Sequence, residues 1–141
     1  MTIYFDMDGT IADFYGVPNW LQYLNNSDPT PYIEARPLLN FSSLARLLHK
    51  AQRLGYGVGI ISWTSKTGTQ EFNEAVALAK REWLMRHLPS VEWNEIHIVA
   101  YGTPKGTLGS GILFDDEERN RNEWGEEAYT PEEIIEFLRR L

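Results

Sequence analysis

The segment Thr2-Ile3-Tyr4-Phe5-Asp6-Met7-Asp8-Gly9-Thr10 is the most informative part of this 141-residue chain. Its first four residues are β-branched or aromatic and predict a short strand at Thr2–Phe5. Two carboxylates, Asp6 and Asp8, follow the strand, and a glycine turn comes next. Such an oxygen-rich site suits Mg²⁺, and one carboxylate can act as a nucleophile while its neighbour donates and accepts a proton. The competing interpretation is an acidic cap at a strand end that binds no metal.

Apolar runs alternate with helical patterns along the rest of the chain. Further strands are predicted at 57–62, 96–100 and 111–114, and helices at 41–54, at 72–88 and after Thr130, which supplies an N-cap before Pro131. This alternation predicts an α/β fold, a doubly wound, Rossmann-like parallel sheet flanked by helices. Ligands of such sheets bind beyond the carboxyl ends of the strands.

Polar side chains follow every one of these strands. Ser62 ends the second strand, Lys105 lies in the loop after the third, and Asp115 and Asp116 follow the fourth. Together with the first acidic pair they fit attack of a carboxylate on phosphorus, which forms an aspartyl-phosphate. Mg²⁺ neutralises charge between the two anions, and a lysine and a hydroxyl hold the phosphate oxygens.

Each of these assignments has an alternative in the sequence. Thr64 or Ser65 could take the place of Ser62, and Lys66 is the rival of Lys105. Asp115-Asp116 could also be the acidic start of a helix, stabilised by the helix dipole.

The pattern resembles the haloacid dehalogenase (HAD) superfamily of phosphohydrolases. The matching segments, in family order and over nearly the whole chain, are Asp6-Met7-Asp8-Gly9-Thr10, Ile60-Ile61-Ser62, Pro104-Lys105 and Ile112-Leu113-Phe114-Asp115-Asp116. The resemblance implies a HAD-like fold with Asp6 as the nucleophile and Asp8 as the general acid and base. It implies that Ser62 and Lys105 bind the phosphoryl group. It also implies a Mg²⁺ site at Asp6, Asp8, Asp115 and Asp116, with Asp8 contributing its backbone carbonyl.

Substrate specificity is expected to lie in residues 14–36, rich in aromatic and turn residues. HAD inserts at this position form a cap, and this one is very small, with at most a short helical element at 18–24. Phe14, Trp20 and Tyr32 either pack the cap or offer faces on which a base stacks. The segment 31–38 is similar to the 5'-nucleotidase and 5'(3')-deoxyribonucleotidase branch, which favours a nucleoside monophosphate as substrate.

Composition limits the class of protein. The length and the 43% hydrophobic content predict one domain over residues 1–141 with a cap insert at about 14–36. The absence of cysteine excludes disulfides, and no long apolar run or basic leader is present, so we expect a cytoplasmic protein without membrane contact. A net charge of −7 disfavours stable binding to duplex nucleic acid but allows a small phosphorylated substrate.

Two other functions fit parts of the pattern. A 3'-phosphatase acting on polynucleotide ends would use the same residues. A phospho-acceptor module resembling a response-regulator receiver also combines aspartate, lysine, a hydroxyl and an acidic pair, but receivers carry the acidic pair on the first strand. The second acid of Asp6-Met7-Asp8 can promote hydrolysis, which favours an enzyme.

Overall fold

The computed structural model describes all residues from Met1 to Leu141. At its centre lies a five-stranded sheet with the strand order β5-β4-β1-β6-β7, in which every neighbouring pair is parallel. Its strands are β1 (Thr2–Phe5), β4 (Gly57–Trp63), β5 (Glu95–Val99), β6 (Gly111–Phe114) and β7 (Ala128–Tyr129). The predicted α/β fold with a parallel sheet is therefore confirmed, and only the two-residue β7 was not predicted.

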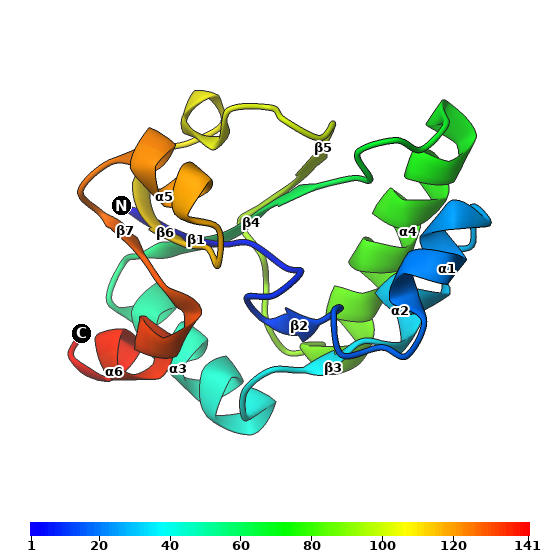
Figure 1. Ribbon diagram of the computed structural model, residues 1–141. Helices are drawn as coiled ribbons and strands as arrows, with labels where there is room; N and C mark the ends of the chain where they lie inside the picture. The colour runs from blue at the N-terminus through cyan, green and yellow to red at the C-terminus, as the bar shows by residue number, and fades with distance from the viewer.

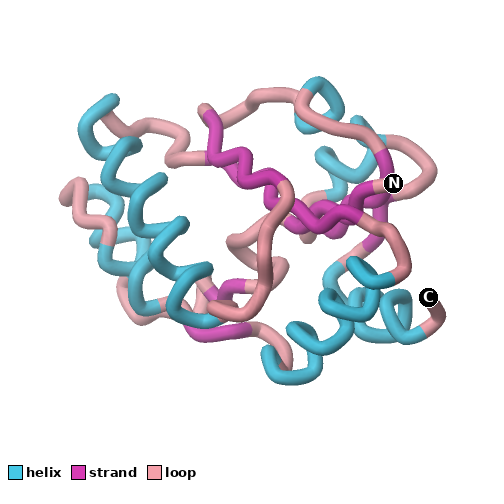
Figure 2. Tube along the Cα trace, turned by 180° about the vertical axis from the view of Figure 1, so that it is seen from behind, coloured by secondary structure: helices cyan, strands magenta, loops and turns pink.

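Helices cover both faces of this sheet, as Figures 1 and 2 show from opposite sides. The main helices are α3 (Phe41–Arg53), α4 (Gln70–His87), α5 (Glu118–Trp124) and α6 (Ile134–Arg139), with short 3₁₀ turns η1 (Lys105–Thr107) and η2 (Pro131–Glu133). Ile3 and Phe5 of β1 join the core beneath α3, α4 and α6. Tyr4 points to the opposite face, where it meets Trp124 of α5 edge-on. The alternation of side chains along one strand thus builds a core on each face.

The helix starts follow from local capping. Asn40 accepts a hydrogen bond from the N–H of Ser43 at the start of α3, and Thr69 accepts one from Phe72 at the start of α4. Thr130 forms a capping box with Glu133, but the box opens η2 before α6 begins. None of the helices combines the length and the apolar content needed to cross a membrane.

The segment expected to form a cap lies between two short strands. β2 (Ala12–Asp13) and β3 (Arg36–Pro37) pair antiparallel, and α1 (Trp20–Asn25) and α2 (Thr30–Glu34) lie between them. The expectation of a single helical element was wrong, because the Asp28 side chain accepts from the N–H of Thr30 and Pro31 sits in the first turn, which starts α2. α2 packs against α4, so the insert is anchored to the main body (Figure 1).

Candidate active site

The parallel register places the predicted residues at one edge of the sheet. Phe5 lies opposite Phe114 on β6 and opposite Ile60 on β4. Asp6, one residue beyond Phe5, donates its N–H to the Phe114 carbonyl at 2.9 Å. Asp6 and Asp115 therefore leave the sheet side by side.

Lys105 connects these two carboxylates. It lies at the start of η1 and is buried, at 2% exposure. Its Nζ is 3.1 Å from Asp6 Oδ1 and donates to Asp115 Oδ2 at 2.7 Å and to the Ile61 carbonyl at 3.0 Å. Burial alone would lower the pKa of Lys105, but Asp6 and Asp115 outweigh it and raise that pKa above its ordinary value. A charged ammonium group is thus fixed beside the first carboxylate of the motif.

Three acids form a cluster that could hold a metal ion. Asp6, Asp115 and Asp116 each offer one carboxylate oxygen, and these oxygens lie within 4.8 Å of one another. Burial and the neighbouring carboxylates raise the pKa of Asp115 to about 6 and that of Asp116 to about 7. The three carboxylates repel one another, and a divalent cation bound between them would relieve this repulsion.

The two acids after β6 have different partners. The Asp115 carboxylate is fully buried and accepts hydrogen bonds from Lys105, from Asn120 at 3.1 Å and from the N–H of Glu117 at 2.9 Å. Asp116 has one side-chain partner, the Thr10 hydroxyl at 3.3 Å. Its carboxylate lies against the backbone of Gly9, where an added Cβ would collide with it. Both oxygens of Asp115 are therefore engaged, whereas Asp116 keeps capacity for a further ligand.

Asp8 and Ser62 are brought together by a lysine that the sequence analysis missed. Lys80 of α4 donates to Asp8 Oδ2 at 3.0 Å, to Ser62 Oγ at 2.7 Å and to the Trp63 carbonyl at 2.7 Å. Burial is the main cause that raises the pKa of Asp8, and Lys80 opposes this rise. The Asp8 carboxylate lies outside the three-acid cluster, and the contribution of its backbone carbonyl to a metal site stays a prediction.

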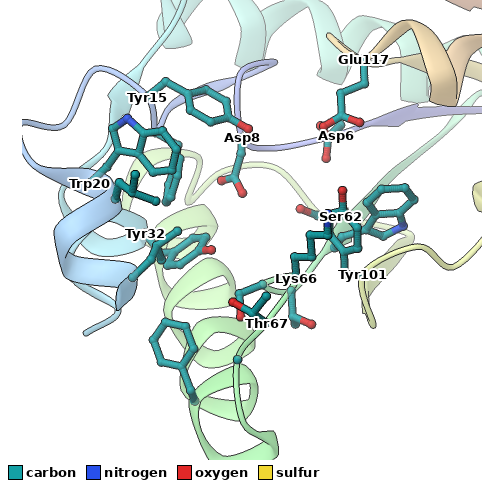
Figure 3. Close-up of a pocket in the computed structure, with 18 of the residues that line it drawn as sticks. Asp6, Asp8, Tyr15, Trp20, Tyr32, Ser62, Lys66, Thr67, Tyr101 and Glu117 are labelled. Atoms are coloured by element: carbon teal, nitrogen blue, oxygen red, sulfur yellow. The ribbon is translucent and has the colours of Figure 1, made fainter. Parts of the chain in front are cut away.

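A cavity of about 500 Å³ opens above these residues. Its lining includes Asp6, Asp8, Ser62 and Lys105, which lie at or near the carboxyl-terminal edge of the sheet. Figure 3 shows Asp6 and Asp8 pointing toward the cavity from the sheet, with aromatic rings of the insert on the far side of Asp8. Carboxylates, an ammonium group and a hydroxyl therefore face one space.

The aromatic residues predicted to contact substrate all line this cavity, but unequally. Phe14 and Tyr32 are buried at 3% and 6% exposure and pack in a cluster with Phe72, so most of their surface serves the packing of the insert. Trp20 is only partly buried, and the neighbouring Tyr15, whose ring meets it edge-on, is 51% exposed. Tyr15 and Trp20 offer more free aromatic surface to a ligand than the other two.

The alternative residues after β4 also line the cavity but have other contacts. The Ser65 hydroxyl donates to Asn73 at 2.6 Å, which fixes the loop to α4. The Lys66 amine lies 5.9 Å from the centre of the Tyr101 ring and has no acidic partner. Ser62 and Lys105 contact the residues around Asp6 and Asp8, whereas Ser65 and Lys66 do not, and the phosphoryl-binding role of Ser62 and Lys105 stays a prediction.

Comparison with known proteins bears on the fold. No protein-family model matches the chain, and no curated protein matches it significantly. A solved structure of D,D-heptose 1,7-bisphosphate phosphatase from Burkholderia thailandensis is similar, with a TM-score of 0.60 and 14% sequence identity over 99% of this chain and 96% of that one. The likeness supports the predicted α/β fold with a parallel sheet and gives no support to the nucleotidase branch.

Proposed function

We propose that the protein is a Mg²⁺-dependent phosphomonoester hydrolase that works through an aspartyl-phosphate on Asp6. The observation that carries the proposal is the position of Asp6 at the cavity floor, within 3.1 Å of Lys105 and beside two further acids. A second carboxylate, Asp8, faces the same cavity. The fold shared with a solved phosphatase agrees with this assignment.

The chemistry can be written with the residues of this chain. An Asp6 oxygen attacks phosphorus while the ester P–O bond breaks, and protonated Asp8 gives its proton to the leaving oxygen. Asp8 then takes a proton from water, which attacks phosphorus and releases phosphate and the Asp6 carboxylate. Lys105 and Ser62 hold the equatorial oxygens as negative charge develops on them. Burial raises the pKa of Asp8, which favours the protonated form that the first step needs.

The acids present fit a Mg²⁺ ion. The three acids of the cluster, Asp6, Asp115 and Asp116, have one buried ammonium group beside them, that of Lys105, so an excess of negative charge remains for a divalent cation to balance. We propose Asp6 and Asp116 as direct ligands, with Asp115 orienting them, because its own oxygens already accept three hydrogen bonds. When bound, Mg²⁺ would neutralise charge between the nucleophile and the phosphate.

The first-choice substrate is a nucleoside monophosphate. We propose that the insert at 14–36 is a cap, and that the exposed faces of Tyr15 and Trp20 stack on the base. A net charge of −7 favours a mononucleotide over a polynucleotide end. The heptose bisphosphate of the similar solved enzyme makes sugar phosphates the natural comparison class.

Phosphate release from p-nitrophenyl phosphate tests the reaction. We expect turnover with Mg²⁺, no turnover with EDTA, and a loss of at least about a thousandfold in Asp6→Asn, because the amide cannot act as the nucleophile. Asp13→Asn is the matched control, since Asp13 accepts from the N–H of Gly16 and does not line the cavity. A near-normal rate in Asp6→Asn contradicts the nucleophile assignment.

Two further measurements separate the alternatives. A receiver-like module would take up phosphate once from acetyl phosphate and hold it for hours instead of turning it over. A phosphate-release screen over nucleoside monophosphates, sugar phosphates and 3'-phosphorylated oligonucleotides identifies the substrate class. Preference for the oligonucleotides contradicts the mononucleotide proposal.

A further inference from the structure

Lys80 is a fully buried lysine that the reaction described above does not use. It lies on α4, and its side chain is 1% exposed. An ammonium group has three hydrogens and no acceptor, and all three are engaged, by Asp8, Ser62 and the Trp63 carbonyl. Burying a charge is costly unless it is paired and hydrogen-bonded in this way, so the three contacts account for its stability in the interior.

The contact with Ser62 determines which way the serine hydroxyl points. Ser62 Oγ accepts from Lys80 at 2.7 Å and makes no other side-chain hydrogen bond. Its single hydrogen is therefore directed away from Lys80, and Ser62 lines the same cavity as Asp6. A hydroxyl held in this way is a donor to any oxygen placed in the cavity, which is what binding of a phosphoryl oxygen requires.

The contact with Asp8 fixes the second carboxylate. Lys80 holds Oδ2, so Oδ1 is the oxygen left for the leaving group and for water. The Tyr32 ring lies over the ammonium group, with its centre 5.3 Å away, and shields it on the side of the insert. Lys80 itself is not among the residues that line the cavity, so we expect it to act on a ligand there only through Asp8 and Ser62.

We infer that Lys80 is a positioning residue, which fixes Ser62 as a hydrogen-bond donor to the phosphoryl group and fixes the carboxylate of Asp8 toward the leaving group. This inference rests on the proposed phosphatase function. The two buried lysines then have different tasks. Lys105 contacts the nucleophile Asp6, whereas Lys80 orients Ser62 and Asp8.

The test is a double-mutant cycle measured with p-nitrophenyl phosphate and Mg²⁺. Lys80→Met should lower kcat roughly 100-fold and leave KM within about threefold, because the oriented contacts strengthen as charge develops in the transition state. In a Ser62→Ala background the same change should cost at most about tenfold, because one of the two oriented groups is already absent.

Trp83→Phe provides the matched control for structural damage. Trp83 lies on the same helix, is buried, and donates to the Ala35 carbonyl at 2.8 Å. This variant should lower the thermal midpoint and keep kcat near the wild-type value. If Lys80→Met does not fold, Lys80→Gln, which keeps a shorter amide donor, is measured in the same cycle and should show a smaller loss with the same non-additivity.

The outcomes separate this inference from the proposed function. If the wild type releases phosphate and the folded Lys80 variant has a kcat within about threefold of it, the positioning role is wrong and the phosphatase function stands. An equal loss with and without the Ser62 hydroxyl also overturns the role, because it shows that Lys80 does not act through Ser62. If the wild type releases no phosphate from any substrate class, the proposed function fails and this inference fails with it.

Discussion

Removing the ammonium group of Lys105 should destabilise the protein in a pH-dependent way. Its side chain is 1% exposed and holds two carboxylates, Asp6 at 3.1 Å and Asp115 at 2.7 Å. Deleting one partner of a buried ion pair costs about 3–5 kcal/mol, because the other charge is left unpaired. We therefore expect Lys105→Met to lower the free energy of unfolding by about 4 kcal/mol at pH 8 in the absence of metal.

The loss should be smaller at pH 5. The pKa of Asp115 in the folded protein is about 6, above its ordinary value, so this carboxyl is largely protonated at pH 5. A group with a raised folded pKa stabilises the folded state most at low pH, and its contribution is lost as pH rises through that pKa. Without Lys105 the pKa of Asp115 rises further. At pH 5 the cost should therefore fall to about 1–3 kcal/mol, the range for unsatisfied buried hydrogen-bonding groups.

Urea unfolding followed by tryptophan fluorescence measures both values, with EDTA present at pH 5 and pH 8. Lys50→Met is the control, because this lysine donates at the surface to a single backbone carbonyl, that of Arg139. Its effect should stay within about 0.5 kcal/mol at both pH values. A loss below about 1 kcal/mol for Lys105→Met at pH 8, or an equal loss at both pH values, refutes the reasoning.

Three further predictions concern the metal and the substrate. Mg²⁺ should raise the thermal midpoint more at pH 8 than at pH 5.5. Burial raises the pKa of Asp115 to about 6 and of Asp116 to about 7, so that protons compete with the metal at the lower pH. Calorimetry with Mg²⁺ or with EDTA measures the shift in the midpoint, and equal shifts at the two pH values contradict the prediction. Gly9→Ala should lower the Mg²⁺-dependent rate at least about tenfold, because Gly9 has a φ of 77° and an added Cβ would displace the Asp116 carboxylate. If the rate of the variant depends on Mg²⁺ concentration as the rate of the wild type does, this prediction is wrong. Trp20→Ala should raise KM for a nucleoside monophosphate roughly tenfold and leave KM for glycerol 2-phosphate unchanged, and equal effects on both substrates rule out base stacking.

The centre of the sheet could be predicted from the sequence because β1, β4 and β6 are short apolar runs whose side chains are mostly buried. β1 and β6 have the predicted bounds, and β4 extends one residue further. α5 and β7 could not be predicted in this way. The sequence of α5 is charged and lacks an apolar stripe. Side-chain contacts with residues outside the helix hold it: Trp124 Nε1 donates to the Gly111 carbonyl at 3.0 Å, and Arg121 donates to the Asp115 carbonyl at 2.9 Å. Tertiary structure decides such elements, and propensity does not.

Lys80 escaped the sequence analysis because it stands in a charged run, Lys80-Arg81-Glu82, which is typical of a solvated helix face. Helical spacing contained the missing signal. Lys80 lies four residues after Val76 and four before Leu84, and both of these apolar residues are buried. A lysine at a core position of an amphipathic helix indicates a buried partner, which here is the Asp8 carboxylate.

The balance of charge explains why the site should depend on metal for stability as well as for reaction. Each buried lysine pairs with one carboxylate of the Asp6-Met7-Asp8 motif, and Lys105 is shared with Asp115. The Asp116 carboxylate accepts a hydrogen bond from the Thr10 hydroxyl and has no lysine beside it, and the net charge of the chain is already −7. Without a metal ion, the carboxylates of this cluster either take up protons or repel one another. The raised pKa values of Asp115 and Asp116 reflect this repulsion together with burial. Because a cation bound only by the folded state stabilises it by mass action, we expect metal binding and folding to be coupled through the acids that follow β6.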